Sequence, residues 1–160
     1  MIQIKSSDDK PARASGCTCS KLRRLARRVT AVYDRTLSAA GMRVTQYSLL
    51  SNLRGTQGVP MSQLAQTLDM DRTTLTRNLK PLLEAGWVNV EPSSDDARVR
   101  LVYLTPAGGK QWQMARSYWR QAQDEVNATI GAENLIGLHQ MLDAYVPLFR
   151  PPVGTDGDSG

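Results

Sequence analysis

Residues 60–86 read PMSQLAQTLDMDRTTLTRNLKPLLEAG, and this stretch decides the fold. A short helix is predicted from Pro60 to about Asp69, because the apolar residues between them have the spacing of one buried helix face. The carboxylate of Asp71 can cap the backbone N–H groups of a second helix, which Gly86 ends. The apolar stripe of this second helix consists of Leu75, Leu79, Leu82 and Leu83. Two helices joined by so tight a turn indicate a helix-turn-helix.

The opposite face of the second helix carries cations and short hydroxyls: Arg72, Thr73, Thr74, Thr76, Arg77 and Lys80. Cations neutralise DNA phosphates, and an arginine also reaches base edges, so this face suits a DNA major groove. An ordinary solvated helix face is the alternative. Pro81 removes the hydrogen bond to the carbonyl of Arg77, so a kink is expected in this helix.

Residues 87–104, WVNVEPSSDDARVRLVYL, predict a β-hairpin. Both ends of this stretch are rich in β-branched and aromatic residues, and the link between them is polar. Near the tip, the carboxylate of Asp96 is expected to hold the guanidinium of Arg98 extended toward a minor groove, with Arg100 as a further candidate contact. A surface ion pair is the alternative. The predicted fold is mainly α with a small β-hairpin wing, a winged helix-turn-helix.

The chain resembles the MarR family of bacterial and archaeal transcription regulators through two segments, LAQTLDMDRTTLTRNLKPLLEAGWV and DDARVRLVYLTPAG. The resemblance covers roughly residues 18–148 and implies a homodimer with one winged domain per subunit. It implies DNA contacts in the recognition helix at Arg72, Thr73, Thr74, Thr76 and Arg77. In the wing it implies contacts at Asp96 and Arg98.

Further helices are predicted at about residues 19–39, at about 46–53, from Thr105-Pro106 onward, and in a last segment ending before Pro147. The first and last carry apolar stripes: Leu22, Leu25, Val29, Val32, Leu37, and Leu135, Leu138, Leu142, Tyr145. A small protomer cannot cover apolar faces at both ends, so pairing of the N- and C-terminal helices across a two-fold axis is expected, and with it a palindromic double-stranded DNA operator.

The expected organisation is one folded domain at residues 16–148 between a flexible arm at 1–15 and a flexible tail at 149–160. Within the domain, the winged part is expected at about 45–105 and the dimerisation helices at about 18–40 and 106–148.

The composition fits a nucleic-acid partner but does not demand one. The 160 residues carry a net charge of +5 and an isoelectric point near 9.5. No run of 18 apolar residues occurs and the N-terminus lacks the apolar core of a signal peptide, so a cytoplasmic protein without a membrane partner is expected. The first helix is unusually basic through Lys21, Arg23, Arg24, Arg27 and Arg28. It could flank the DNA backbone, line an anion pocket or simply be solvated.

Two cysteines, Cys17 and Cys19, precede this basic helix. No second cysteine pair stands at zinc-site spacing, so no metal site is predicted. Cys19 near a helix start among arginines favours a reactive thiolate, with Cys17 as the resolving thiol; small cysteines without a redox role are the alternative. The organic-hydroperoxide-sensing branch of the MarR family has a similar spacing of five residues, which are here Cys19, Tyr33, Gly41, Gln46 and Tyr47. This similarity implies that Cys19 is the reactive cysteine and Tyr33 a residue that contacts it.

The alternative signal is a small aromatic or phenolic effector, bound between the dimerisation helices and the winged part. Arg27, Tyr33, Trp112 and Trp119 are the candidate contacts, although helical aromatic residues also serve as core. No catalytic triad, phosphate-binding glycine loop or carboxylate pair emerges, so neither enzymatic activity nor a cofactor is expected. A winged protein-interaction module without DNA binding is a further alternative.

Overall fold

The computed structural model describes residues 16–149. Its helices are α1 (Thr18–Leu37), α2 (Val44–Leu53), α3 (Met61–Thr67), α4 (Arg72–Glu84), α5 (Pro106–Ile130) and α6 (Ala132–Tyr145), with 3-10 segments η1 (Ser38–Ala40) and η2 (Val146–Phe149). The strands are β1 (Val59–Pro60), β2 (Val88–Pro92) and β3 (Arg100–Leu104). The predicted arm at residues 1–15 lies outside the described residues, as does the predicted tail from residue 150.

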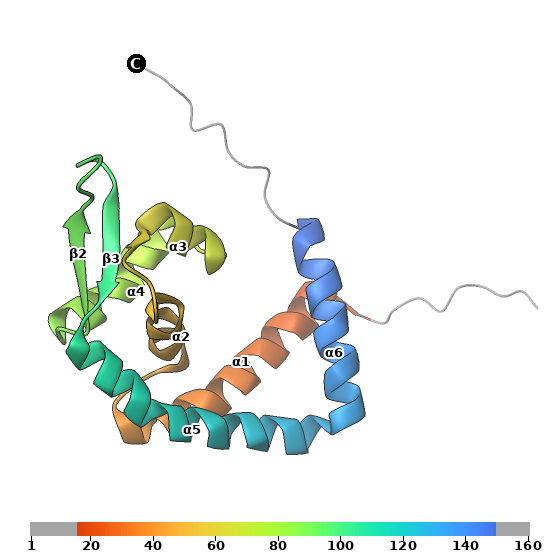
Figure 1. Ribbon diagram of the computed structural model, residues 1–160. Helices are drawn as coiled ribbons and strands as arrows, with labels where there is room; N and C mark the ends of the chain where they lie inside the picture. Colours follow the sequence, from red (N-terminus) through yellow and green to blue (C-terminus); the bar gives the residue numbers. More distant parts are fainter. Residues whose placement is uncertain (1–15, 150–160) are drawn as a thin grey trace, which may run out of the picture.

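The long helix α5 connects two parts of the molecule, one at each of its ends (Figure 1). At its start stand α2, α3, α4 and the three strands, which we call the winged lobe (residues 44–104). At its end the chain turns into α6, and α1 packs along α5. The architecture is mostly helical with a small antiparallel sheet, which confirms the predicted winged helix-turn-helix.

The sheet has three strands in the order β1-β3-β2, one more than predicted. The hairpin pairs β2 with β3, so that Val90 lies opposite Val102. The additional strand β1 pairs Val59 with Val102 and Pro60 with Leu101. A two-residue strand that contains a proline has no alternation of polar and apolar residues, so no sequence pattern could have revealed it.

The core of the winged lobe is built largely from leucines. Leu75, Leu79 and Leu82 of α4 are buried as predicted. The prediction was wrong for Leu83, which is 41% exposed. Leu83 lies eleven residues after Arg72, about three helical turns of about 3.6 residues, and therefore shares the polar face of α4 rather than its buried face.

Local hydrogen bonds decide where α2 and α5 begin. The Val44 N–H donates to Asp34 Oδ1 at 2.8 Å, and this bond helps to start α2 two residues before the predicted position. At α5, Thr105 Oγ1 accepts the N–H of Gly108 at 3.0 Å, which confirms the predicted cap, and its hydroxyl donates to the carbonyl of Gly86 at 2.7 Å. Thr105 thus joins the start of α5 to the end of the helix-turn-helix.

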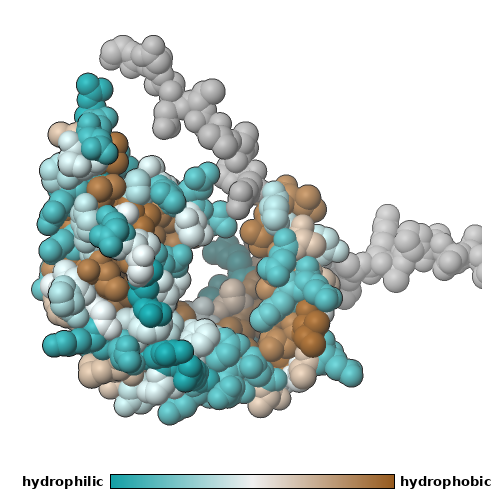
Figure 2. Space-filling model, in the orientation of Figure 1, coloured by the Kyte–Doolittle hydropathy of each residue, from teal (hydrophilic) through white to brown (hydrophobic). Residues whose placement is uncertain are grey.

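Large apolar side chains remain exposed at the end of the molecule opposite the winged lobe. Figure 2 shows hydrophobic residues gathered over α6. The exposed set comprises Leu22 and Leu25 of α1, and Ile136, Met141, Leu142, Tyr145, Val146, Leu148 and Phe149 of α6 and η2. We call these nine residues the apolar patch. Within residues 16–149, no helix is both long and apolar enough to cross a membrane.

Candidate nucleic-acid interface

Asp71 fixes the start of α4. Its Oδ1 accepts the backbone N–H of Thr74 at 2.7 Å, and its Oδ2 accepts the Thr74 hydroxyl at 3.0 Å. These hydrogen bonds stabilise the carboxylate and hold the pKa of Asp71 below its ordinary value of 3.8. The hydroxyl of Thr74 is therefore engaged in the cap, whereas its neighbours on the polar face are not.

The turn before α4 is equally well defined. Asp69 adopts a left-handed backbone conformation with φ of 48°, which asparagine and aspartate tolerate better than most residues. The N–H of Met70 donates to the carbonyl of Ala65 at 2.9 Å, and the Asn78 side chain donates to the Met70 sulfur at 3.4 Å. The two helices of the motif are thereby joined with little freedom.

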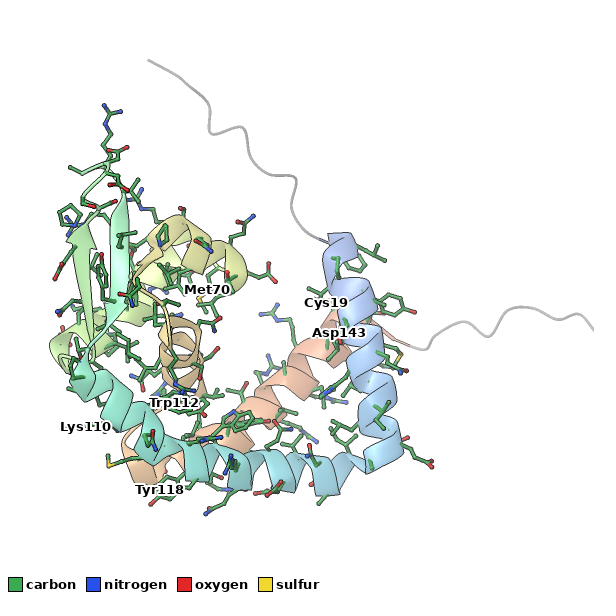
Figure 3. All side chains as sticks on the ribbon, viewed as in Figure 1. Cys19, Met70, Lys110, Trp112, Tyr118 and Asp143 are labelled. Atoms are coloured by element: carbon green, nitrogen blue, oxygen red, sulfur yellow. The ribbon has the colours of Figure 1, made fainter. Side chains whose placement is uncertain are left out.

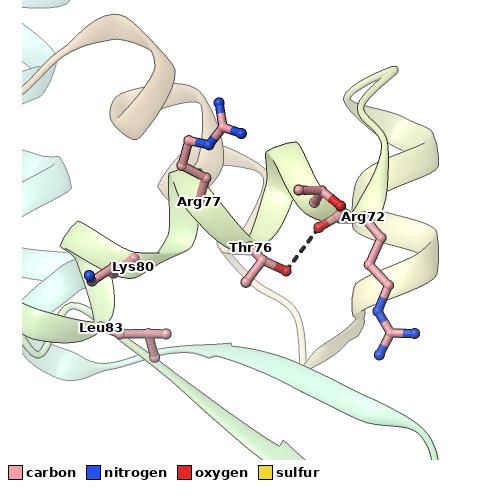
Figure 4. Close-up of a pocket in the computed structure, with 6 residues that line it drawn as sticks. Arg72, Thr76, Arg77, Lys80 and Leu83 are labelled. Atoms are coloured by element: carbon pink, nitrogen blue, oxygen red, sulfur yellow. Dashed lines mark hydrogen bonds between the residues drawn. The ribbon is translucent and has the colours of Figure 1, made fainter.

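The polar face of α4 forms an open groove on the surface (Figure 4). It is lined by Arg72, Thr73, Thr76, Arg77, Lys80 and Leu83. Five of the six residues predicted for this face are thus brought together, and Thr74 is the exception. All the polar lining residues are exposed, while the leucines on the other side of α4 hold the helix to the lobe. Such a surface of accessible cations and hydroxyls has the chemistry for phosphate and base-edge contacts.

Two residues of this face, Thr76 and Lys80, make contacts within α4. The Thr76 hydroxyl donates to the Arg72 carbonyl at 2.8 Å, so its methyl group and oxygen are held in one orientation (Figure 4). Lys80 lies 3.9 Å from Glu84 in an exposed ion pair, which is worth little in water and does not prevent the ammonium from meeting a phosphate. The helix continues past Pro81 to Glu84.

The tip of the wing differs from the prediction. Asp96 Oδ1 accepts the backbone N–H of Arg98 at 2.9 Å, and the described wing contains no ion pair between the Asp96 carboxylate and the Arg98 guanidinium. The reason is that an aspartate readily accepts from the backbone two residues later and so shapes the turn itself. Arg98 is exposed and free to extend, whereas Arg100 Nη2 donates to the Val90 carbonyl at 3.3 Å and is held against the sheet.

The cysteines lie far from this surface. Cys17 is the N-cap of α1, Cys19 is in its first turn, and both thiols are exposed. Figure 3 places Cys19 at the end of the molecule opposite the wing. Tyr33 follows Cys19 on the same helix by fourteen residues, about 21 Å at about 1.5 Å per residue, so contact between the two requires a second copy of the chain. Within residues 16–149, no group of three or more His, Cys, Asp or Glu side chains is placed to hold a metal ion.

Three of the four candidate effector residues pack around Tyr47, which the sequence analysis did not include among the effector contacts. Tyr47 of α2 stacks with both Trp112 and Trp119, with ring centroids 5.7 Å apart in each pair. Tyr33 lies against Trp119 and donates its hydroxyl to Gln123 Oε1 at 2.6 Å. Burial raises the pKa of Tyr33, which keeps that hydroxyl protonated as a donor. Arg27 is exposed on α1, apart from this cluster.

Comparison with known proteins identifies relatives of both the winged lobe and the helices around it. The profile of the MarR family matches residues 42–99. The multiple antibiotic resistance protein MarR of Salmonella typhimurium is 30% identical over 114 residues, which are 69% of this chain and 78% of that protein.

Solved structures extend the similarity to most of the described chain. The transcriptional regulator MosR of M. tuberculosis, solved in complex with DNA, is 36% identical with a TM-score of 0.67, covering 81% of this chain and 98% of that chain. A mutant MarR from E. coli, solved in complex with operator DNA, shares the fold at 22% identity with a TM-score of 0.74, covering 81% of this chain and 93% of that chain. Because the winged lobe is less than half of the chain, both similarities include flanking helices.

Proposed function

The chain belongs to the MarR family of transcription regulators, and from this premise we propose that it acts as a homodimer that binds a palindromic operator. The observation that carries the proposal is the polar groove of α4, in which exposed cations and hydroxyls line one continuous surface. The contacts proposed on α4 are Arg72, Thr73, Thr74, Thr76, Arg77 and Lys80. Those proposed on the wing are Asp96, Arg98 and Arg100.

Within this set, the structure supports a division of roles. Arg77 lines the groove and is proposed to meet base edges in the major groove of DNA. Arg98 extends from the wing tip and is proposed to enter the minor groove beside it. Thr74 and Asp96 act through the backbone turns that they stabilise, because their polar side-chain groups already have intramolecular partners.

The apolar patch supports the dimer. Nine large apolar side chains on α1, α6 and η2 lie open to solvent, and apolar residues gathered in this way on a surface mark interaction sites. Pairing these helices across a two-fold axis would bury the patch and place one winged lobe on each side, and two identical lobes require a palindrome.

A repressor is the mode of regulation that we favour. Two winged lobes bound to one operator would block the access of RNA polymerase to that DNA. Repression of this kind requires only that the protein binds DNA and is released from it. Release is proposed to follow oxidation of Cys19, with DNA binding taking place in the cytoplasm.

The chemistry of that release can be written for the two exposed thiols. The Cys19 thiolate attacks the terminal oxygen of an organic hydroperoxide, the O–O bond breaks, and an alcohol leaves with the sulfur oxidised to sulfenic acid. The Cys17 thiol then displaces water and forms a disulfide. Cys17 is the N-cap residue of α1 and Cys19 stands in its first turn, so this disulfide would form at the very start of the helix.

A regulator that answers only to a small aromatic or phenolic ligand is the second candidate. The stacked rings of Tyr47, Trp112 and Trp119 favour it, because a planar ligand that separated them would gain the same stacking contacts. Arg27 and Tyr33 remain its further candidate contacts. Cys19 would then have no role in sensing.

The test is binding of the reduced protein to DNA from its own upstream region in the presence of unrelated competitor DNA. The complex should be selective and should weaken steeply with salt, because phosphate contacts release counterions. Organic hydroperoxide should then dissociate the complex, and a thiol reductant should restore it.

Variants separate the two signals. Cys19→Ser should bind the operator as the wild type does and lose its response to hydroperoxide. Full oxidant sensitivity in Cys19→Ser would remove Cys19 as the sensor, and selective binding that ignores oxidant in the wild type would favour the aromatic ligand. Binding without any sequence preference would contradict the regulator itself.

A further inference from the structure

Five side chains form a continuous column between the winged lobe and the helices that flank it: Arg54, Trp112, Tyr47, Trp119 and Tyr33. The Arg54 guanidinium lies 3.7 Å from the centroid of the Trp112 ring. Tyr47 is 5.7 Å from both indoles and within 15° of parallel to each. Trp119 then meets Tyr33 at 6.5 Å. We call this set the aromatic column.

The column interleaves two helices. Trp112 and Trp119 are seven residues apart on α5, about 10.5 Å along the helix, which matches one ring of Tyr47 stacked between them. Tyr47 of α2 stacks on the Trp112 ring, and Arg54, the C-cap residue that follows α2, places its guanidinium over the same ring. A movement of α2 relative to α5 would therefore disturb both Tyr47 stacks and the contact of Arg54 with Trp112.

Hydrogen bonds fix the same two helices at this point. The Trp112 indole N–H donates to Ser51 Oγ of α2 at 2.7 Å (Figure 3 labels Trp112). One residue before it, Gln111 donates to the Ala40 carbonyl of η1 at 2.6 Å. The α5 segment around Trp112 is thus held both by α2 and by the connection from α1.

Further contacts connect the column to α4 on one side and to α1 on the other. On one side α2 packs on α4, whose buried leucines belong to the same core as Tyr47. On the other side α1 is joined to α5, where Arg35 donates to both carboxylate oxygens of Glu125 at 2.6 and 2.7 Å. The column therefore lies on the path of contacts that joins α4 to α1 and α5.

We infer that the aromatic column sets the angle between the winged lobe and α5, so that Tyr47, Trp112, Trp119 and Arg54 are positioning residues for the separation of operator half-sites. The inference rests on the proposed function, because the separation has meaning only in a dimer on DNA. The lever is long: α4 spans about 20 Å, so tilting it by about 10° moves its end by about 3.5 Å, close to the rise of one base pair at about 3.4 Å. A small change in the arrangement of the aromatic column therefore changes the separation of operator half-sites that the dimer binds best.

The experiment compares operator duplexes whose half-site centres are at the natural separation, one base pair closer or one base pair further apart. Tyr47→Leu keeps an apolar side chain but removes the ring between the indoles. Tyr47→Phe keeps the ring and loses only the hydroxyl. Tyr118→Leu is the matched control, because Tyr118 lies on α5 between the two tryptophans in sequence and packs on the core without belonging to the column (Figure 3).

In the wild type, changing the separation by one base pair should weaken binding by about tenfold or more, since half-site spacing is a geometric requirement. Tyr47→Leu should reduce this penalty to about threefold or less, or move the optimum to another duplex, while Tyr47→Phe and Tyr118→Leu keep the wild-type profile. If Tyr47→Leu fails to fold, Arg54→Met supplies the same comparison, because Arg54 is exposed and its loss removes one end of the column.

A Tyr47→Leu or Arg54→Met protein that retains the wild-type spacing penalty would overturn the inference, and so would an equal loss of the penalty in Tyr118→Leu. Wild-type protein that binds none of the duplexes selectively would instead contradict the proposed function.

Discussion

At the scale of single residues, Arg77 and Arg98 have the same charge and different surroundings. Arg77 lines a groove between hydroxyls on a helix, whereas Arg98 stands alone at the tip of a hairpin. Arg77→Ala should reduce the preference for operator over unrelated DNA by about 1–3 kcal/mol, the cost of one bidentate base contact. Arg98→Ala should weaken binding to all sequences more uniformly. Competition binding with operator and random duplexes measures both effects.

Arg120→Ala is the matched control, since Arg120 is an exposed arginine of α5 outside the proposed interface. Equal affinity and selectivity in all three variants and the wild type would refute the assignment of Arg77 and Arg98 to DNA contacts.

Asp71 gives α4 a pH dependence. Its hydrogen bonds with Thr74 lower its pKa in the folded protein, so the ionised cap stabilises fully above the ordinary value of 3.8 and is lost as the pH falls through the lower folded pKa. At neutral pH, Asp71→Ala should lower the thermal midpoint by about 2–4 °C. The difference from wild type should shrink below pH 3.8.

Thermal melts at fixed protein concentration, from pH 7 down to pH 3, would measure this change. Asp71→Asn supplies an uncharged cap, so the advantage of the wild type over this variant should also disappear in acid. A gap between wild type and Asp71→Ala that stays constant with pH would contradict the charged cap.

At the scale of elements, the approach of α5 to the start of the wing depends on one glycine. A Cβ at Gly108 would lie 2.0 Å from the Trp87 carbonyl oxygen, whereas a Cβ at the adjacent Gly109 would meet nothing within 4 Å. Gly108→Ala should therefore destabilise the protein by about 1–3 kcal/mol through overpacking. Gly109→Ala should stabilise it by about 0.5–1 kcal/mol, because alanine loses less conformational entropy in a helix.

Denaturant unfolding of the two variants would measure both values, and neither substitution touches the proposed DNA surface. A gain of stability in both variants would show that helix propensity, not the contact with Trp87, decides the result.

The elements themselves were largely predictable from the sequence, and their contacts were not. Periodicity located the helices and the hairpin because each has an apolar face with its own spacing. It wrongly assigned Leu83 to the buried face of α4, because a leucine near the end of an apolar stripe fits the helical periodicity whether it is buried or exposed. It also could not show that Asp96 accepts from the backbone or that Tyr47 lies between two indoles, because such pairings depend on geometry across elements. The clustering of cations and hydroxyls on one face of α4 could be predicted, because a single helix determines that arrangement.

At the scale of the whole molecule, the apolar patch and the winged lobe lie at opposite ends of α5. Introducing charge into the patch by Ile136→Glu together with Tyr145→Glu should leave each protomer folded, because both side chains are exposed, and should halve the mass in solution. The variant should lose affinity for the palindrome while keeping weak, non-specific DNA binding. Sedimentation and operator titration would measure the two changes.

Met114→Glu provides the control, as Met114 is 58% exposed on α5 and lies outside the patch. A monomeric wild type that still binds the palindrome tightly would contradict the dimer.

The aromatic column also has a spectroscopic consequence. Two of the three tryptophans of the chain, Trp112 and Trp119, are in contact with Tyr47, and only Trp87 is elsewhere. In a Trp87→Phe variant, the indole emission would come only from Trp112 and Trp119, which lie where the winged lobe meets α5. The protein thus contains an intrinsic fluorophore pair where the winged lobe meets α5. Titration with operator, hydroperoxide or a phenolic ligand would show, without any attached dye, whether the surroundings of this pair change.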